Sequence, residues 1–451
     1  MWSIGTHFSP PSPPLPWNGN SAIHTITINF VDKADKLCYD IVMNIQSRIV
    51  EQNPQWKGGL FPVPQFTRDL FGPLYESLTS PLMTFLSGPR RVGKSVVLKQ
   101  LINHLVTRDR VKPSGILFFE FSPKQTTEYI REVYRYFKEN ILQTGPHTYL
   151  FFDEVQMIPG FEIALKELYD VLDQTKTKVV ITGSPSISYK RNMAESLAGR
   201  FIPYRLFPLN FKEYLRLGTS PLQSSIDKLT GDHVTRMGIL EELNMEFKRF
   251  LSWGRLPQML TLSDTEKTYY LESTIDQSIT KDAFDYFRIE NPGALSAMYI
   301  YLCQNSGQII SKDHVSKASG ISLVTVATYL DVLELMGLTY TVHNSTNPII
   351  RLNSARKIYV SSMVALKNSK YDPQTAFGFA AESYILERLL EQHELVTFYR
   401  NRAKEIDFLL PKRNIAYEVK YRPVFEQPKV ILPNYELKVL SLSGSAPVCL
   451  F

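Results

Sequence analysis

Eight consecutive residues have the types and spacing of a phosphate-binding loop. They are Gly88, Pro89, Arg90, Arg91, Val92, Gly93, Lys94 and Ser95, and they spell the pattern GxxxxGK[ST]. The two glycines allow the backbone to point its N–H groups at phosphate oxygens, and a helix that begins near Lys94 adds the positive end of its dipole. Lys94 would reach the β- and γ-phosphates, and the Ser95 hydroxyl would ligate Mg²⁺. The motif therefore predicts a binding site for ATP and Mg²⁺.

The residues on either side of this loop have the pattern that it requires. Residues 83–87 are a short apolar run that predicts a buried strand. After the loop, apolar residues recur at helical spacing, namely Leu98, Leu101, Ile102 and Leu105. Strand, loop and helix in this order are what phosphate binding needs. The alternative, an ordinary glycine-containing turn before a helix, is disfavoured by these flanks.

A pair of carboxylates follows a second predicted strand. Residues 147–152 are apolar and aromatic, which suits a central strand, and Asp153 and Glu154 come directly after them. Asp153 is expected to hold the Mg²⁺, and Glu154 is expected to polarise the attacking water as a general base. The alternative interpretation is a strand that ends in solvated acids.

A third apolar run covers residues 178–184 and ends in small polar residues. We expect a strand here, with Thr182 or Ser184 placed to sense the γ-phosphate. A plain strand-to-turn transition explains the same residues, so the sequence leaves this role open.

Four segments in order carry a family resemblance. They are GPRRVGKS, FFDEVQMIPGFEIALKELYD, ITGSPSISY and ESLAGRFIPYRLFPLNFKEYL. Together they resemble the archaeal-type AAA-superfamily P-loop ATPases of archaea and bacteria, whose C-terminal half is a domain of unknown function. The match runs from about residue 81 to about residue 422. It implies an α/β ATPase core, a parallel sheet with helices on both faces that binds nucleotide at the carboxyl ends of its strands.

Two arginines become candidates through this resemblance. Arg200 matches a recurring arginine of these proteins, either a finger that contributes roughly a thousandfold or more to turnover or a surface or helix-capping residue. The chain also has Gly254-Arg255-Leu256-Pro257 where the family has a Gly-Gly-Phe-Pro turn. The substitution leaves a charge beside a turn, which makes Arg255 a candidate second sensor of nucleotide.

The length of 451 residues exceeds the size at which one core stops growing, so two to four domains are expected. From the patterns and the resemblance together we divide the chain into five parts. They are a Pro-rich extension (1–50), an AAA-like ATPase core (51–210), a helical lid (211–290), a winged-helix domain (291–365) and a small α/β nuclease-like domain (366–451).

Composition predicts a soluble globular protein of the cytoplasm. The chain is 44% hydrophobic and 21% charged, and without a run of eighteen apolar residues we expect no membrane span. The Pro-rich start lacks the pattern of a secretory signal. Cys38, Cys303 and Cys449 are far apart and fit neither a disulfide framework nor a zinc site, which indicates a reducing compartment. The net charge of +6 is compatible with nucleic acid but dilute on a chain of this size.

The sequence between residues 295 and 360 predicts helix, helix, turn, helix and then short strands. Ser311 and Ser322 are expected to cap the second and third helices, with Gly320 at the turn between them. Winged-helix modules have this arrangement and often lay the third helix in the major groove of DNA. Because residues 321–337 contain no lysine or arginine and phosphate contacts dominate DNA affinity, we favour a structural or protein-contact role over DNA reading.

The last part of the chain contains a second set of candidate catalytic residues. Glu382 on a predicted amphipathic helix, Asp407, and the pair Glu418 and Lys420 resemble the core of PD-(D/E)xK nucleases. In such cores two carboxylates on adjacent strands hold a divalent metal. The lysine, two residues further along the strand and so on the same face, orients the nucleophilic water.

The local pattern alone is weak evidence for this assignment. Residues 246–248 and 436–438 have the same [DE]xK spacing, so only the hairpin context, Asp407 and Glu382 distinguish Glu418. The usual Pro-Asp is Ile406-Asp407 here, which keeps the proposed metal ligand.

Three classes of function are compatible with these features. The first is a nucleotide-driven switch that acts on DNA through the nuclease-like domain. The second is an ATPase whose C-terminal half only recruits protein partners, with the carboxylates as inert remnants. A small-molecule kinase is the third, and the sequence shows no acceptor pocket for it. Candidate partners are ATP, DNA and, because AAA relatives often form rings, further copies of the chain.

Overall fold

The computed structural model describes twelve stretches of the chain: residues 45–123, 125–143, 145, 147–184, 197–225, 233–345, 356–366, 371–392, 395–401, 404–422, 432–442 and 447–451. The chain divides into two compact units, residues 1–52 and residues 53–451. Of the extension predicted over 1–50, only residues 45–50 are described, and they are helical; its proline-rich stretch and Cys38 lie outside the described residues. All candidate functional residues belong to the second unit.

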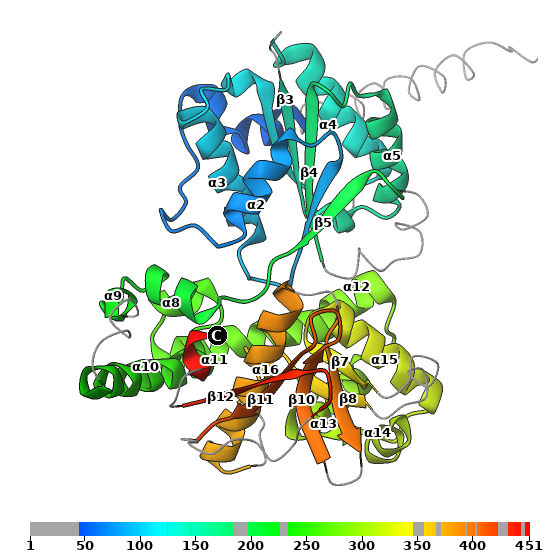
Figure 1. The fold of residues 1–451 in the computed structure, drawn as a ribbon. Helices are drawn as coiled ribbons and strands as arrows, with labels where there is room; N and C mark the ends of the chain where they lie inside the picture. The colour runs from blue at the N-terminus through cyan, green and yellow to red at the C-terminus, as the bar shows by residue number, and fades with distance from the viewer. Residues whose placement is uncertain are drawn as a thin grey trace, which may run out of the picture. The chain divides into compact units, whose positions relative to one another are not determined.

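A sheet of five parallel strands forms the first part of this unit (Figure 1). Its strand order is β2 (Ile116–Glu120), β3 (Thr148–Asp153), β4 (Thr177–Gly183), β1 (Met83–Ser87) and β5 (Phe201–Arg205). Strands of parallel sheets are covered on both faces and therefore read as nearly continuous apolar runs. The three strands predicted from such runs are β1, β3 and β4, and the predicted parallel α/β fold is confirmed.

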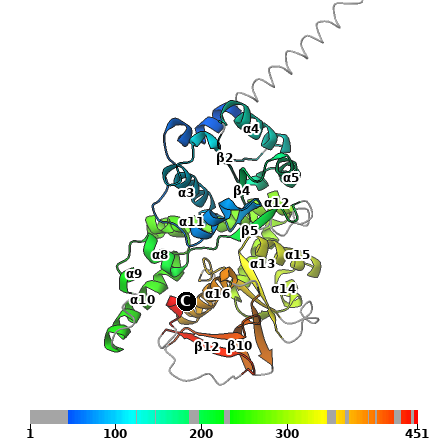
Figure 2. The same cartoon turned by 45° about the horizontal axis from the view of Figure 1, so that its top comes forward.

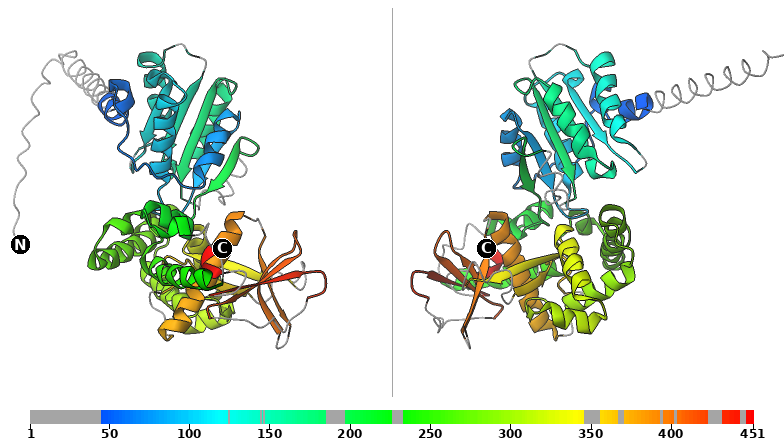
Figure 3. Two further views of the ribbon diagram at one scale, coloured as in Figure 1. Left: turned by 60° about the vertical axis from the view of Figure 1, so that its left-hand side comes forward. Right: turned by 90° about the vertical axis from the view of Figure 1, so that its right-hand side faces the viewer.

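Helices lie on both faces of this sheet (Figure 3). They include α2 (Phe71–Glu76), α3 (Lys94–Thr107), α4 (Thr127–Asn140) and α5 (Phe161–Val171), with short 3₁₀ turns at Pro54–Lys57, Ser77–Thr79, Pro113–Gly115 and Val155–Met157. The apolar positions predicted for α3 are all buried. The helix begins directly after the glycine-rich loop, as the strand, loop and helix pattern predicts.

The segment after β5 is mostly helical, as predicted for residues 211–290. It consists of α8 (Phe211–Leu217), α9 (Leu222–Ser225), α10 (His233–Trp253), a 3₁₀ turn (Pro257–Thr261), α11 (Asp264–Asp276), the π-helix η7 (Gln277–Asp282) and α12 (Ala283–Phe287). A π-helix is rare and is frequently found at functional sites. In this chain it separates α11 from α12.

Three helices and then two antiparallel strands follow, in the order predicted. The helices are α13 (Pro292–Gln304), α14 (Lys312–Ser319) and α15 (Leu323–Leu335), and the strands are β7 (Thr339–Asn344) and β8 (Arg356–Val360). A short strand, β6 (Ile309–Ile310), lies between α13 and α14. Ser311 Oγ accepts a hydrogen bond from the backbone N–H of His314 at 3.2 Å, and Ser322 Oγ accepts one from Thr325 at 3.1 Å. Gly320 has a φ of +71°. The predicted caps and turn are therefore confirmed.

The hairpin β7–β8 belongs to a larger sheet that also contains the C-terminal strands. The order is β12 (Glu436–Ser441), β11 (Ile415–Lys420), β10 (Lys404–Leu410), β9 (Thr397–Asn401), β7, β8 and β6. Parallel pairing of β7 with β9 joins the two groups. Figure 2 shows α16 (Pro373–Gln392) beside the C-terminal strands, and a 3₁₀ turn (Val448–Leu450) lies near the end of the chain. The boundary predicted at 365/366 thus lies within one sheet.

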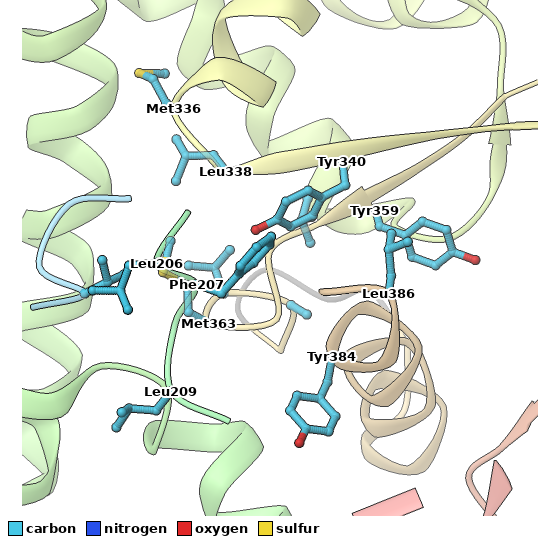
Figure 4. Packing of buried hydrophobic residues seen from close by; sticks show 14 of the residues in the cluster. Leu206, Phe207, Leu209, Met336, Leu338, Tyr340, Tyr359, Met363, Tyr384 and Leu386 are labelled. Carbon is cyan, nitrogen blue, oxygen red and sulfur yellow. The ribbon is translucent and has the colours of Figure 1, made fainter. Parts of the chain in front are cut away.

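The two sheets share one buried apolar cluster. Figure 4 shows where the segment after β5 meets the start of β7, with the Phe207 ring against the Tyr340 ring at a centroid distance of 6.4 Å. The backbone N–H of Phe211 donates a hydrogen bond to the Tyr384 hydroxyl of α16 at 3.2 Å. The chain that leaves the first sheet is therefore packed into the core of the second.

Two expectations from composition concern membranes and cysteines. In the part of the chain that the structure describes, no single helix is long and apolar enough to cross a membrane. Only α14 and α15 taken together are apolar enough, and the two are bent by 102° to each other. Cys303 and Cys449 are free and buried.

Candidate nucleotide site and a C-terminal acidic cluster

The loop between β1 and α3 curls around its own lysine. A Cβ on Gly88 would lie 2.4 Å from the carbonyl oxygen of Leu206, and Gly93 has a φ of +104°, so both positions require glycine. Lys94 is buried, and its Nζ donates to the carbonyl oxygens of Gly88 at 3.0 Å and Pro89 at 3.1 Å. The ammonium group therefore lies inside the turn of the loop, beside the N-terminus of α3.

A buried arginine that we did not predict, Arg68, is hydrogen-bonded to the backbone of this loop. The guanidinium of Arg68 donates to the carbonyl oxygens of Val92 and Phe207, each at 2.8 Å, and forms an ion pair with Glu213 at 2.8 Å. The loop, the segment after β5 and the start of α8 are thus tied to one side chain. Because Arg68 belongs to no local motif and its acidic partner is 145 residues away, the sequence alone gave no signal of its role.

Asp153 ends β3 as a fully buried carboxylate. One of its oxygens accepts a hydrogen bond from the Thr182 hydroxyl, while Oδ2 is buried and has no hydrogen-bond partner among the described residues. Burial, together with the charge of Glu154, raises the pKa of Asp153 to about 6, and the Ser95 and Thr182 hydroxyls act in the opposite direction. A buried carboxylate oxygen without a partner, beside a serine hydroxyl, is a donor set that fits Mg²⁺.

Glu154 follows in a backbone conformation that is uncommon for a residue with a side chain. Its φ is +56°, in the left-handed region, and its N–H donates to the Thr182 hydroxyl at 3.0 Å. Gln156 Nε2 donates to its carboxylate. Non-glycine residues in this region cost of order 1 kcal/mol and cluster at functional sites. The turn gives Glu154 a fixed direction, different from that of the strand.

A pocket of about 220 Å³ lies at the carboxyl edge of the sheet. Its lining includes Lys94, Ser95, Glu154 and Ser184. Thr182 is buried instead, and its hydroxyl is hydrogen-bonded to the Asp153 carboxylate and to the backbone N–H of Glu154. Open parallel sheets generally bind ligands at this edge. Of the two residues expected near a γ-phosphate, Ser184 is therefore the one that reaches the pocket.

Four residues that line this pocket come from outside the five-stranded sheet and its helices. They are Ser278 and Asp282 from η7, Tyr286 from α12 and Met336 after α15. Burial raises the pKa of Asp282, and the charge of Arg90 counteracts this rise. The sequence motifs did not identify these residues, because they lie more than a hundred positions from the loop.

The tip of the loop is in contact with the same outside segments. Arg90 Nη1 donates to both carboxylate oxygens of Asp282, at 2.5 and 2.7 Å. Arg91 donates to the Thr274 hydroxyl at 2.7 Å, and its guanidinium lies 4.3 Å from the centre of the Tyr270 ring. Two consecutive loop residues are thus bonded to α11 and η7.

Gly337, in the turn after α15, contacts the loop from another direction. It has a φ of +71°, and a Cβ at this position would lie 2.7 Å from Cγ of Pro89. The contact therefore joins the helices after residue 290 directly to the phosphate-binding loop.

Arg200 lies at the opposite edge of the sheet from the loop of its own chain. Its carbonyl oxygen accepts a hydrogen bond from Met83 at the start of β1, and its guanidinium pairs with Asp170 at 3.1 Å. The loop follows the other end of β1, roughly 16 Å away at the rise of a strand. Arg200 does not line the nucleotide pocket, so a role as an arginine finger would require a neighbouring copy of the chain.

The hypothesis that Arg255 senses nucleotide is wrong. Arg255 is 2% exposed, and its guanidinium forms an ion pair with the buried Glu387 of α16 and donates to the Ser362 hydroxyl at 2.7 Å. It also lies over the Phe250 ring at 5.0 Å. The guanidinium is paired with α16, because a buried charge requires a partner of opposite sign, and it joins the helical segment to that helix.

In the C-terminal sheet the four residues predicted from the nuclease resemblance come close enough to interact. Glu382 accepts a hydrogen bond from the Tyr359 hydroxyl at 3.3 Å, and Asp407 Oδ2 accepts one from the backbone N–H of Val419 at 2.9 Å. Glu418 pairs with Lys420 at 2.5 Å. Burial and the charge of Asp407 raise the pKa of both Glu382 and Glu418.

Lys357 of β8 extends into the same group of carboxylates, and the sequence did not identify it. Its Nζ lies 2.6 Å from Glu405 Oε1 and 3.6 Å from Asp407 Oδ1. Burial opposes its charge, but the carboxylates of Asp407, Glu382 and Glu405 outweigh this effect and raise the pKa of Lys357. We call Glu382, Asp407, Glu418, Lys420, Lys357 and Glu405 the acidic cluster.

A divalent metal does not fit the acidic cluster in this conformation. Across the described ranges, no group of three or more histidine, cysteine, aspartate or glutamate side chains is placed to hold a metal ion. The ammonium of Lys357 occupies the neighbourhood of Asp407 instead. The predicted metal ligands Glu382, Asp407 and Glu418 are thus near one another without forming a metal site.

Comparison with known families assigns the first sheet. Residues 80–215 match the AAA domain family. This stretch contains the loop, Asp153 and all five strands of the first sheet, and the strands of the second sheet lie after it. The part of the chain that forms the first sheet is therefore similar to AAA domains. Residues 244–363 match a family described only as a domain of unknown function, which extends from α10 to the turn after β8.

Similar proteins in other organisms carry no assigned function. An uncharacterized protein of Haemophilus influenzae is 24% identical over 356 residues, which cover 76% of this chain and 82% of that protein. An uncharacterized protein of Methanocaldococcus jannaschii is 22% identical over 379 residues, which cover 78% of this chain and 80% of that protein. The similarity extends beyond the AAA-type domain in both cases.

Similar solved structures include two replication proteins. The Orc1 protein of Aeropyrum pernix in complex with DNA is 14% identical, with 72% of this chain and 95% of that chain covered and a TM-score of 0.31. The replication initiator DnaA bound to AMPPCP and single-stranded DNA is 14% identical, with 63% and 92% covered and a TM-score of 0.24. Likeness at this level carries no argument about the function of this chain.

Proposed function

We propose that the protein binds ATP with Mg²⁺ at residues 88–95 and hydrolyses it. The observation that supports this most strongly is the buried Asp153 carboxylate, which lies close to Ser95 and has an oxygen without a hydrogen-bond partner among the described residues. A bound Mg²⁺ would supply that positive charge and polarise the phosphate oxygens. Lys94 would move from the loop carbonyls to the β- and γ-phosphates, and the backbone N–H groups of the loop would bind phosphate oxygens.

In this proposal Glu154 holds the attacking water and accepts its proton. The left-handed turn at Glu154 and the hydrogen bond from Gln156 fix the carboxylate in the pocket that Lys94 and Ser95 also line. General bases positioned in this way contribute about 10²- to 10⁴-fold to a reaction rate. The direction of the side chain is set before the substrate binds, so little reorganisation is needed during hydrolysis.

We further propose that nucleotide binding acts as a switch for the C-terminal half. Pro89, Arg90 and Arg91 lie at the tip of the loop, and they contact the turn at Gly337, η7 and α11 respectively. A γ-phosphate would compete with Asp282 for Arg90, because both are anions within reach of the same guanidinium. Nucleotide would thereby change the contacts that hold these helices to the loop.

Two outputs of this switch were predicted, and one observation supports each. The gathering of Glu382, Asp407, Glu418 and Lys420 favours DNA as the substrate of a nuclease-like domain. A protein-interaction module is favoured by the start of α15, where Leu323 is 47% and Val324 78% exposed. Because no metal fits the acidic cluster in this conformation, we derive no cleavage step.

We also propose that the residues after 290 form a winged-helix domain and a nuclease-like domain. Arg200 is proposed to act on a neighbouring copy in a homo-oligomer, and the protein is proposed to be cytoplasmic.

Lys94→Ala tests the proposed ATPase site. We expect loss of at least about 100-fold in affinity for a fluorescent ATP analogue at saturating Mg²⁺, and no measurable phosphate release, since one ammonium group contacts two phosphates. Lys212→Ala, at an exposed lysine of α8, is the matched control and should behave like the parent protein. If the parent itself fails to bind the analogue, the proposed function is incorrect.

A further inference from the structure

We infer that Lys357 supplies, from within the chain, the positive charge that a divalent metal would supply to the acidic cluster. The cluster in the wild-type protein then does not bind Mg²⁺ or Mn²⁺, and removal of the Lys357 ammonium turns it into a metal site. The inference concerns the nuclease-like part of the proposed function, where it argues against metal-dependent cleavage by the wild-type protein, and it is independent of the proposed ATP site.

The burial of Lys357 is the first observation behind this inference. Its side chain is 4% exposed, and its Nζ is surrounded by groups from β8 and β10. Glu405 lies at 2.6 Å, the Tyr359 hydroxyl at 3.5 Å and Asp407 at 3.6 Å. An ammonium is buried in a protein only where anions and hydrogen-bond acceptors replace its water. The side chain is therefore held in the cluster by these carboxylates.

The second observation is that the carboxylates already have partners. Glu382 Oε2 accepts a hydrogen bond from Tyr359, Asp407 Oδ2 accepts one from the backbone of Val419, and Glu418 pairs with Lys420. A metal needs several of these oxygens to converge at about 2.0 to 2.6 Å. It would also lie within a few ångströms of the Lys357 charge, which repels it.

The two lysines of the cluster differ in a way that points to Lys357 as the decisive one. The Lys420 side chain is 36% exposed and pairs with Glu418, as expected of a residue at the rim. Lys357 is buried and faces Glu405 and Asp407 together. Of the two, Lys357 is the lysine at ion-pair distance from the central carboxylate Asp407, whereas Lys420 interacts with Asp407 at longer range.

Manganese binding to the full-length, nucleotide-free protein tests the inference. Mn²⁺ titration followed by electron paramagnetic resonance should show one more site in Lys357→Met than in the wild type. A Glu418→Gln substitution added to Lys357→Met should remove the new site. Absence of an extra site in a folded Lys357→Met protein would overturn the inference.

Lys438→Met is the matched control for this experiment. Lys438 lies on the adjacent strand β12 in a triplet of the same [DE]xK spacing, and it pairs with Glu436 at 3.5 Å. Removal of this exposed ammonium should create no metal site. If Lys438→Met gains a Mn²⁺ site as strong as that of Lys357→Met, loss of any lysine of this sheet is enough to create a metal site. That result would contradict the special role of Lys357.

A second measurement does not depend on the folding of the Lys357 variant. Wild type and Glu418→Gln should bind Mn²⁺ identically, because the wild-type cluster holds none. Wild-type protein should likewise leave plasmid DNA intact in Mg²⁺ or Mn²⁺ with ATP. A wild-type metal site that disappears in Glu418→Gln, or plasmid cleavage that disappears in Lys420→Ala, would overturn the inference. Neither result would affect the proposed ATP site, which is measured by nucleotide binding.

Discussion

The two acidic sites of this chain differ in what neutralises their central aspartate. Asp153 at the end of β3 is buried, accepts hydrogen bonds from hydroxyl groups and retains an oxygen without a partner. Asp407 in the C-terminal sheet has the buried ammonium of Lys357 nearby and a backbone N–H as donor. The number and spacing of carboxylates therefore do not by themselves identify a metal site. The presence or absence of an internal cation is the more informative feature.

The largest expected difference between the two sites is in catalysis. Glu154→Gln should bind ATP like the parent and hydrolyse it about 10²- to 10⁴-fold more slowly, because the amide cannot accept a proton from water. Glu418→Gln is the matched change in the acidic cluster and should leave ATP turnover unchanged. Steady-state phosphate release together with analogue binding measures both. Equal turnover of Glu154→Gln and the parent would remove Glu154 from its role as base.

The two aspartates should respond to the same substitution with opposite sign. Asp153→Asn is expected to stabilise the metal-free protein at pH 7 by about 1 to 3 kcal/mol, because it removes a charge that burial disfavours. Asp407→Asn is expected to destabilise it by a similar, order-of-magnitude amount, about 1 to 3 kcal/mol, because Lys357 loses one of its anions. Urea unfolding in EDTA measures both changes. Destabilisation by both substitutions would contradict the comparison.

The pH dependence of this difference follows from the pKa of Asp153. The fold raises this pKa from 3.8 to about 6, so the folded state disfavours the carboxylate. The cost is absent below the unfolded pKa of 3.8, grows between this value and the folded pKa of about 6, and is constant above it. The stability gained by Asp153→Asn should therefore increase between about pH 4 and pH 6 and then level off. A gain that shrinks over this range would contradict the assigned cause.

The sequence predicted those features that depend on neighbouring residues in the chain. The loop, β1, β3, β4 and the caps of α14 and α15 follow from local patterns of glycine, apolar and capping residues. It did not predict that β7 pairs with β9, which makes one sheet of two predicted domains. Such pairings join residues far apart in the chain and leave no local pattern.

The side chains that were missed or misassigned have the same explanation. Arg68 pairs with Glu213, Arg255 with Glu387, and Lys357 with residues about fifty positions later. Each is a buried cation whose partner lies on a distant segment. From sequence, a cation beside a turn or within a strand cannot be distinguished from an exposed one, because its burial depends on packing between elements.

The smallest expected effect concerns the contact between the nucleotide loop and the turn after α15. Gly337 and Gly320 both have a φ of +71°, so alanine at either position costs about 1 kcal/mol of backbone strain. Only at Gly337 does the added methyl group meet Pro89, at 2.7 Å, whereas nothing lies within 4 Å at Gly320. Gly337→Ala should lose more stability than Gly320→Ala, because the contact with Pro89 adds to the strain, and only Gly337→Ala should change ATP affinity, by about 3- to 10-fold. Calorimetric titration with a non-hydrolysable analogue measures this change. Equal affinities of the two variants would mean that the turn touches the loop without influencing nucleotide binding.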